Sequence, residues 1–495
     1  MGNLLFKNPE IERNRWAEFS LQRIIAMPVF IVIALAIAYF IGKDQNQYDG
    51  ITQNYIKVNL GFDYVFIASI GLFLAIVIAW GAKNASDGII EEYNNRTWDW
   101  QRSHNLSPWE MTIGKLFGTT LYNWYGGLFC IGGMLVSWPF IEIYQTGIVL
   151  KIIFLILVAI LTHASSAITA LLAIRKADGR GKVKNGLYVI VLFYAFSSII
   201  SPFISTVEGS FSNGYNGSTI DTYWFGLKLS LNLVQFINTS FFTFWAVLGL
   251  YRNFKSEYQY INSSWAWISF ITYLIINQFG TYIDYSVLGE KYHLNLHENL
   301  LFSSLVLIPM MGILAYGTLI LEPKNFIYWK KFYEGLLIRN WKQINNYAPL
   351  WLISFLGFFL VVLLTILFLP YGDLNTLQII PGPFKLLVEF GISEEELPLA
   401  LLSLPLFMLR DFGILLYLHA APRHKRAMGA TIIYLGLLYG AIPGLLTLAS
   451  KHELLFIFVP IGEYPQWSVV SAAIQAGIIG FLLYKKFINR VQLEN

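Results

Sequence analysis

The chain has few charged residues and almost no cysteine. Only 13% of its 495 residues are charged, against roughly 25% in an ordinary soluble domain. A chain of this length with so little charge cannot cover a water-facing surface, which makes a soluble enzyme improbable. The single cysteine, Cys130, excludes disulfide scaffolds, iron–sulfur clusters and thiolate zinc sites, because each of these needs two or more cysteines.

Several ligand-binding signatures are also absent. The net charge is only +4, and the basic residues form no single patch or stripe, so the sequence indicates no nucleic-acid partner. It contains neither a GxxxxGK[ST] phosphate loop nor an HExxH motif, which argues against a directly bound nucleotide cofactor or a helical zinc site. His293 and His297 stand four residues apart, and we interpret them as a coincidence in an outer loop rather than as metal ligands.

Long apolar runs dominate what remains, since 56% of the residues are hydrophobic. A membrane-spanning helix needs about 20 mostly apolar residues, whereas barrel strands would alternate apolar and polar residues. Unbroken runs such as IIAMPVFIVIALAIAYFIG therefore predict an all-α, polytopic membrane protein of about twelve spanning helices in two six-helix halves. The expected spans are 24–42, 61–82, 116–140, 148–174, 186–206, 228–250, 264–283, 299–321, 349–370, 399–421, 431–450 and 467–484.

The basic residues predict the orientation of these spans. With the N-terminus inside, 26 of the 34 Lys and Arg residues fall in inner segments, five in outer loops and three within spans. Because basic residues are retained on the cytoplasmic side, both termini are expected in the cytoplasm, with the chain in a bacterial plasma (inner) membrane. Residues 8–23 carry charges beside Trp16 and Phe19, which suits a short helix at the inner interface rather than a cleaved signal peptide.

Two inner loops resemble one another. The sequence WQRSHNLSP at 100–108 is followed 241 residues later by WKQINNYAP at 341–349, so that Trp100, Asn105 and Pro108 match Trp341, Asn346 and Pro349. Each copy lies between the second and third span of its half. The pattern predicts an internal duplication, with halves 1–255 and 256–495 in the same membrane orientation because each has an even number of spans.

The first of these loops carries a family resemblance. Ser107 and Pro108 are expected as N-cap and first residue of the helix that begins near Trp109. A charged helix that ends in this turn, with an approach helix before the first span, is similar to the inner loop of ABC-2 permeases of ATP-binding-cassette transporters. The residues that carry the resemblance are Leu106, Ser107, Pro108, Trp109, Glu110, Gly114, Lys115 and Leu116.

The resemblance implies a partner and a direction of transport. In that family the permease is not an ATPase, and a separate ATP-binding-cassette subunit docks on the loop helix, so ATP acts through a partner; export is implied by the same resemblance. Aromatic anchors in a polar rim would then form the docking surface. The candidate anchors and loop prolines are Trp98, Trp100, Pro108, Trp341 and Pro349, with Arg96, Arg102, Arg339 and Lys342 as the rim. The alternative for the tryptophans is the aromatic belt at the inner membrane interface.

Two charged residues stand in the middle of an apolar run. Arg410 and Asp411 lie near the centre of 399–421, where a charge costs about 2.5–3.5 kcal/mol and usually faces a bundle interior or a wet cavity. They are the candidates for the transport pathway, with His163 as the counterpart of Asp411 in the first half. Because neighbours on a helix point about 100° apart, we expect the two charges to contact different partners. A buried ion pair that only fixes helix packing is the alternative.

Three classes of function fit this pattern. The first is the permease subunit of an ATP-driven exporter with an unidentified substrate, which is not itself an enzyme. The second is a single-chain secondary carrier, which also commonly has twelve spans in two halves. The third is an intramembrane lipid-modifying enzyme that uses His163 or Asp411, although the sequence shows no nucleophile–base arrangement.

Overall fold

The computed structural model divides the chain into two compact units. Unit 1 comprises Met1–Thr219 and Leu229–Asn262, and unit 2 comprises Ile220–Lys228 and Ser263–Asn495. The structure describes residues 8–49, 54–99, 106–141, 148–177, 182–184, 186, 189–192, 221–283, 296–322, 326–371, 396–419, 427–460 and 464–494.

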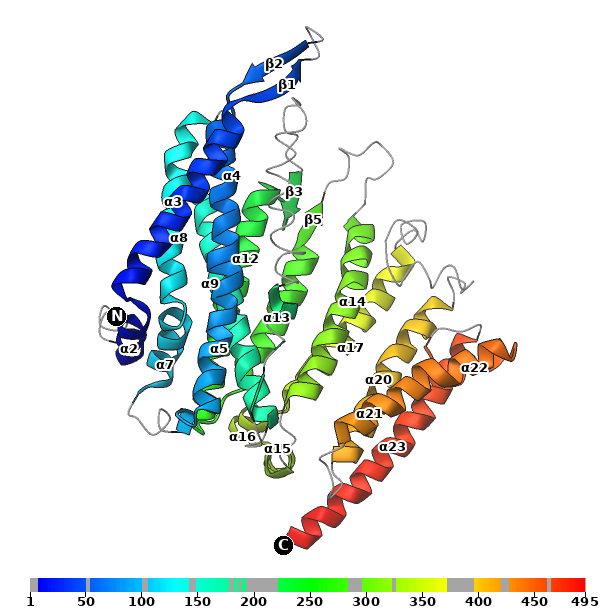
Figure 1. The fold of residues 1–495 in the computed structure, drawn as a ribbon. Helices are drawn as coiled ribbons and strands as arrows, with labels where there is room; N and C mark the ends of the chain where they lie inside the picture. The colour runs from blue at the N-terminus through cyan, green and yellow to red at the C-terminus, as the bar shows by residue number, and fades with distance from the viewer. Residues whose placement is uncertain are drawn as a thin grey trace. The chain divides into compact units, whose positions relative to one another are not determined.

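Unit 1 is a bundle of helices with one hairpin at its end (Figure 1). The short helix α2 precedes the long helix α3, and the hairpin β1–β2 joins α3 to α4. Two π-helical segments, η1 and η2, interrupt the helical rods. The elements are α2 (Pro9–Glu18), α3 (Leu21–Lys43), β1 (Gln45–Asp49), β2 (Asn54–Val58), α4 (Gly61–Phe73), η1 (Leu74–Trp80), α5 (Gly81–Asn94), α7 (Pro108–Ile113), η2 (Gly114–Gly118), α8 (Leu121–Ser137), η3 (Trp138–Phe140), α9 (Ile148–Ala177) and α12 (Leu231–Glu257).

Unit 2 is also mainly helical. Helix α14 packs against α17, and α20 packs against α23. A small sheet has the order β4-β3-β5, in which β3 and β5 pair antiparallel with Thr222 opposite Ile283. The elements are β3 (Asp221–Trp224), β4 (Leu227–Ser230), α13 (Trp265–Gly280), β5 (Thr281–Ile283), α14 (Leu296–Leu321), α15 (Phe326–Ile338), α16 (Trp341–Tyr347), α17 (Leu350–Phe368), η6 (Leu369–Tyr371), α20 (Leu397–His419), α21 (Ala427–Gly436), η8 (Leu437–Ala441), α22 (Ile442–Leu448), η9 (His452–Ile457) and α23 (Pro465–Glu494).

Nine helices in the described part of the chain are long and apolar enough to cross a membrane, so the chain is a polytopic helical membrane protein. They are Leu21–Lys43, Gly61–Asn94, Ile148–Ala177, Leu233–Glu257, Asn299–Leu321, Leu350–Phe368, Leu397–His419, Gly429–Leu448 and Pro465–Phe487. Each contains or overlaps an expected span.

The other three expected spans have a different outcome. Span 116–140 is divided, because η2 and a turn at Thr119 and Thr120 leave α8 with only 17 residues. Span 264–283 gives α13 with 16 residues, after which the chain enters strand β5. Most of span 186–206 lies outside the described residues.

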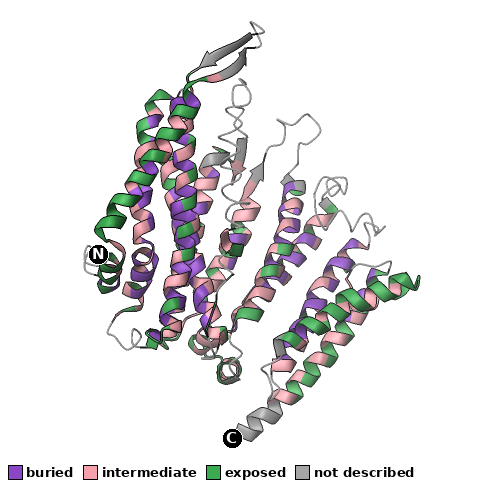
Figure 2. Cartoon of the chain, in the orientation of Figure 1, coloured by how far each residue is buried: buried purple, intermediate pink, exposed green. Residues whose placement is uncertain are grey.

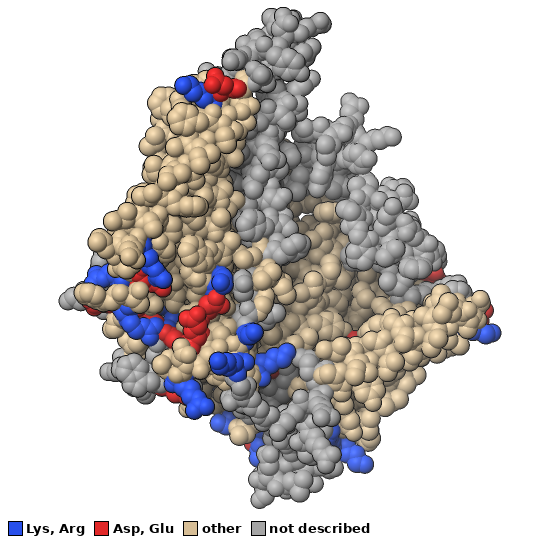
Figure 3. Space-filling model, viewed as in Figure 1, with Lys and Arg blue, Asp and Glu red and all other residues tan. Residues whose placement is uncertain are grey.

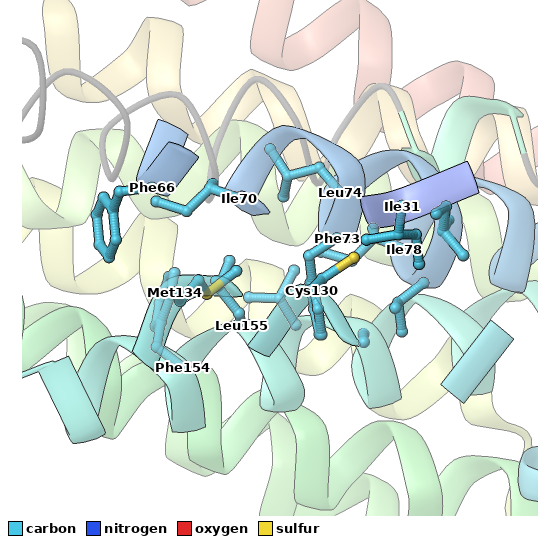
Figure 4. Packing of buried hydrophobic residues seen from close by; sticks show 14 of the residues in the cluster. Ile31, Phe66, Ile70, Phe73, Leu74, Ile78, Cys130, Met134, Phe154 and Leu155 are labelled. Atoms are coloured by element: carbon cyan, nitrogen blue, oxygen red, sulfur yellow. The ribbon is translucent and has the colours of Figure 1, made fainter. Parts of the chain in front are cut away.

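The interior of unit 1 is built from large apolar side chains and from glycines that let helices approach. Phe66 and Phe73 of α4, Met134 of α8 and Phe154 of α9 belong to one buried cluster (Figure 4). A Cβ atom at Gly133 would collide with Ser69 of α4, so glycine permits the close contact of α4 and α8, as small residues do in membrane bundles.

The outer surface of the helices is apolar. Helix α3 exposes most of its side chains, as do α21 and α22 of unit 2 (Figure 2). In Figure 3 the charged side chains of unit 1 gather at the end that carries α2 and α7, and a broad uncharged band separates them from a few at the other end. An uncharged band of this kind suits contact with lipid tails.

Candidate functional site

Arg410 and Asp411 form a buried ion pair in α20. Their side chains are only 2% and 1% exposed, and Nε of Arg410 donates to Oδ1 of Asp411 at 2.9 Å. The expectation that the two charges contact only different partners is therefore wrong. Their Cα–Cβ bonds do diverge on the helix, but the arginine side chain is long enough to fold back onto its neighbour.

Asp411 also joins three helical segments. The hydroxyl groups of Tyr316 in α14 and of Tyr439 in η8 each donate to Oδ2 of Asp411 at 2.7 Å. Tyr439 lies in a π-helical segment between α21 and α22, and such segments are frequent at functional sites. With Arg410 on Oδ1 and two hydroxyls on Oδ2, both oxygens of the carboxylate have donors.

The guanidinium of Arg410 is satisfied less completely. Nη1 donates to Oε1 of Gln475 in α23 at 3.1 Å and lies 3.5 Å from the carbonyl oxygen of Phe458. The rings of Phe407 and Tyr439 stand 4.7 and 5.0 Å from the guanidinium carbon, within the range of cation–π contacts. Nη2 is 2.9 Å from Oδ1 of Asp411, yet within the described residues it has no hydrogen-bond partner.

Irregular backbone reaches the same cluster. The short helix η9 ends at Ile457, whose carbonyl oxygen accepts from Nε2 of Gln475 at 2.6 Å. The hydroxyl of Ser403 contacts the carbonyl oxygen of Pro460 at 3.3 Å, and Ser403 lies about 9 Å along α20 from its first residue. In hydrocarbon such backbone is tolerated only where protein buries it or where it lines a cavity. We call Tyr316, Arg410, Asp411, Tyr439 and Gln475, with the carbonyls of Ile457 and Phe458, the Arg410 cluster.

His163 lies in unit 1 and is also completely buried. Its Nε2 is 2.7 Å from the carbonyl oxygen of Val77 in η1, and the edge of Trp124 packs against its ring. The amide of Asn123 donates to the neighbouring carbonyl of Ile76 at 2.8 Å. The π-helical register of η1 thus offers two successive carbonyls to side chains of other helices. Nδ1 of His163 has no partner in the described part of unit 1.

The structure confirms the expected cap at the end of unit 1 that carries α2 and α7. Ser107 is the N-cap of α7, and its hydroxyl oxygen accepts a hydrogen bond from the backbone N–H of Glu110. The carboxylate of Glu110 in turn accepts a hydrogen bond from the backbone N–H of Ser107. Pro108 is the first helical residue, where its missing N–H costs nothing.

Sequence reasoning missed a second buried charge cluster beside this cap. Nζ of Lys115, in η2, donates to Oε1 of Glu10 at 2.5 Å and to Glu92 of α5. Nη2 of Arg13 bonds the same two carboxylates, at 2.6 Å to Glu10. Burial lowers the pKa of Arg13, but the two glutamates more than offset this, so its pKa lies above the ordinary value. The four residues, here called the Lys115 cluster, connect α2 to η2 and α5.

The candidate docking residues have unequal surroundings. Trp98 is only 4% exposed and packs near Phe254 in the core of unit 1, so its ring is not presented to a partner. Trp341 is 79% exposed at the first residue of α16. Pro349 is the N-cap of α17. Trp100, like Arg102 of the rim, lies outside the described residues.

The two loops that the sequence relates to one another begin with the same kind of turn. Arg96 and Arg339 both have positive φ, 60° and 55°. The next residue in each case bonds back five positions, from Thr97 to Glu92 and from Asn340 to Gly335, which is the hydrogen bond of a Schellman helix end. A tryptophan then starts the next helical turn, Trp98 in unit 1 and Trp341 in unit 2. Gln259 and Ser450 end helices with the same turn, so the turn alone does not align the two loops, although Trp341 follows its turn at the same distance as Trp98 follows its own.

Comparison with family models, with curated proteins and with solved structures finds no match to this chain. Its function has to be argued from its own residues.

Proposed function

We propose that the chain is the membrane permease of a transporter, with the Arg410 cluster in its pathway. The observation that carries this proposal is the buried Arg410–Asp411 pair on a helix that can span a membrane. Ionised groups at this depth are expensive, and they commonly mark the path of a substrate or an ion. The cluster also joins α14, α20, η8 and α23, so a ligand that disturbs it would act on several helices together.

ATP-binding-cassette subunits are the proposed source of energy. Helices α15 and α16 follow the second expected span of the second half, at the place where the resemblance to ABC-2 permeases puts the docking loop. They expose a set of large apolar side chains, namely Ile327, Tyr328, Tyr333, Leu336, Leu337, Ile338 and Trp341. Lys342 is exposed beside them. Apolar anchors with a basic rim are suited to an ATPase groove. Cytoplasmic termini, a bacterial inner membrane and export are parts of the same proposal.

Co-purification tests the docking. Wild-type protein, extracted in mild detergent from its own cells, should retain an ATP-binding-cassette subunit, whereas Trp341→Ala should lose most of it. Trp467→Ala is the matched control, because Trp467 is also exposed, at 55%, but lies in the first turn of α23 at the expected outer side. Retention by Trp341→Ala, or equal loss from Trp467→Ala, would refute docking at α16.

Asp411 favours a second candidate, a secondary carrier. The buried carboxylate of Asp411 accepts hydrogen bonds from the hydroxyls of Tyr316 and Tyr439. If Asp411 took up a proton during transport, both hydroxyls would lose their charged acceptor. Uptake into proteoliposomes separates the candidates: the permease requires its ATPase and ATP, and the carrier requires only an ion gradient. An intramembrane enzyme gains less support, since His163 bonds a backbone carbonyl and Asp411 has donors on both oxygens.

A further inference from the structure

Arg410 carries hydrogen-bonding capacity that the described protein does not use. A guanidinium has five N–H donors, and a buried one is ordinarily bonded through all its nitrogens because an unmet charged donor is costly. Here Nε bonds Asp411 and Nη1 bonds Gln475. Nη2 stands 2.9 Å from Oδ1 of Asp411 in the ion pair but makes no hydrogen bond within the described residues, and the side chain is only 2% exposed.

Asp411 is already surrounded by donors, since Nε and Nη2 of Arg410 both stand 2.9 Å from its Oδ1. Its Oδ1 accepts from Arg410, and its Oδ2 accepts from both Tyr316 and Tyr439. A cationic ligand would therefore have to displace donors that are already bound. What the cluster can still accommodate is an acceptor for the guanidinium, and carboxylate and phosphate are the groups whose geometry fits it.

Tyr439 separates the guanidinium from the apolar surface of unit 2. Its ring covers Arg410 at 5.0 Å and its hydroxyl bonds Asp411, yet the residue is 37% exposed. The flanking helices α21 and α22 expose Ile432, Ile433 and Leu445. A ligand that reaches Arg410 past Tyr439 therefore comes from an apolar environment, which favours a molecule with an alkyl chain.

We propose that Arg410 binds the headgroup of an anionic amphiphile, a carboxylate or phosphate on a long alkyl chain. In the structure Asp411 takes the place of that headgroup. An incoming anion competes with Asp411 for the guanidinium, and the carboxylate that it displaces carries its bonds to Tyr316 and Tyr439 with it. Binding is thereby coupled to α14 and to η8. That this amphiphile is the cargo rests on the proposed transport function, whereas its binding does not.

Binding of dodecyl phosphate to the purified full-length protein in a neutral maltoside detergent tests this inference. The readout is the rise of the thermal unfolding midpoint with probe concentration, from which a Kd follows. Inorganic phosphate, dodecanol and dodecyltrimethylammonium separate the contributions of the charge, the chain and the sign of the charge. We expect saturable stabilisation by dodecyl phosphate only.

Two substitutions have opposite expected effects. Arg410→Gln should weaken dodecyl phosphate binding at least tenfold, since the anion loses its partner. Asp411→Asn should strengthen it severalfold, because the competing carboxylate is gone while the side-chain shape remains; a general loss of folding cannot produce that gain. Lys451→Gln is the control, since it removes one exposed positive charge of unit 2 near η9 and should leave Kd unchanged.

The inference is overturned if Asp411→Asn binds dodecyl phosphate no better than wild type, or if Arg410→Gln retains its affinity. Binding of the trimethylammonium probe in place of the phosphate would overturn it too, and binding of inorganic phosphate alone would exclude the amphiphile. If Arg410→Gln does not fold, the Asp411→Asn result decides. No ATPase is present in the assay, so a failure of the proposed ATP-driven transport leaves these results unaffected.

Discussion

Lys115 holds together the end of unit 1 that carries α2, η2 and α5. It is fully buried between Glu10 and Glu92, and Arg13 is the second cation on these carboxylates. Removing one partner from a buried ionic network leaves charges without compensation, which typically costs about 3–5 kcal/mol. We expect Lys115→Met to lower the free energy of unfolding by about this amount, measured by denaturation of the purified protein.

The appropriate comparison is Lys83→Met. Lys83 is exposed and stands 4.0 Å from Asp87, and exposed pairs contribute about 0–1 kcal/mol. Equal stability of Lys115→Met and wild type would contradict this prediction, because an apolar side chain of similar volume would then stabilise unit 1 as well as the charged lysine does.

Glycine at position 81 determines how closely α5 and α9 can pack. The two helices are neighbours, and a Cβ atom at Gly81 would collide with the imidazole of His163. Overpacking a filled interior costs about 1–3 kcal/mol. Gly81→Ala should therefore destabilise unit 1 by about that amount, as measured by the thermal unfolding midpoint.

The same spanning helix provides a matched control. A Cβ at Gly71 meets nothing within 4 Å, so Gly71→Ala should be neutral or stabilising by up to about 1 kcal/mol. Combining Gly81→Ala with His163→Ala should recover part of the loss, because the colliding ring is gone. Strict additivity of the two losses would mean that the contact does not limit this helix pair.

Hydrophobic runs and caps could be read from the sequence, but side-chain positions could not. Runs of about 20 apolar residues predict helices because the bilayer demands them, and Ser107 predicts a helix start because a local hydrogen bond suffices. The π-helical segments η1 and η2 leave no mark in the hydrophobic pattern. The burial of Trp98 depends on Phe254, far away in the sequence, and the Arg410–Asp411 contact depends on a rotamer. For Lys115, the only signal was a lysine at the start of an expected span.

For the whole chain, the duplication stays a prediction, because the turn at Arg96 and Arg339 is a general helix end that Gln259 and Ser450 also form. Arg96 and Arg339 occupy the same unusual backbone conformation, 243 residues apart, whereas Pro108 and Pro349 are 241 apart. The turn and the proline are two residues further apart in the first loop than in the second, which accounts for both spacings. The sequence aligned Trp341 with Trp100 because it assumed no such difference.

The number of membrane crossings is the property of the whole chain most open to a direct test. Most of the expected span 186–206 lies outside the described residues, and one crossing more or fewer there would invert every later loop. With Cys130 replaced by serine, single cysteines at Lys43 and Lys451 should react with a membrane-impermeant maleimide in intact cells. Cysteines at Arg15 and Lys342 should react only after permeabilisation. All four positions are exposed, so failure to react reports the membrane side rather than burial.

The outcome is decisive because two positions lie on the same side of the membrane only if an even number of spans separates them. Lys43 follows the first expected span and Lys451 the eleventh, so twelve spans put them on the same side. If 186–206 does not cross, Lys451 moves to the inner side, opposite Lys43, and Lys342 moves to the outer side, the side of Lys43. Arg15 and Lys342 on the same inner side would also satisfy the requirement that both inner loops reach one cytoplasmic ATPase. Labelling of Lys342→Cys in intact cells would contradict the twelve-span topology and docking at α16 together.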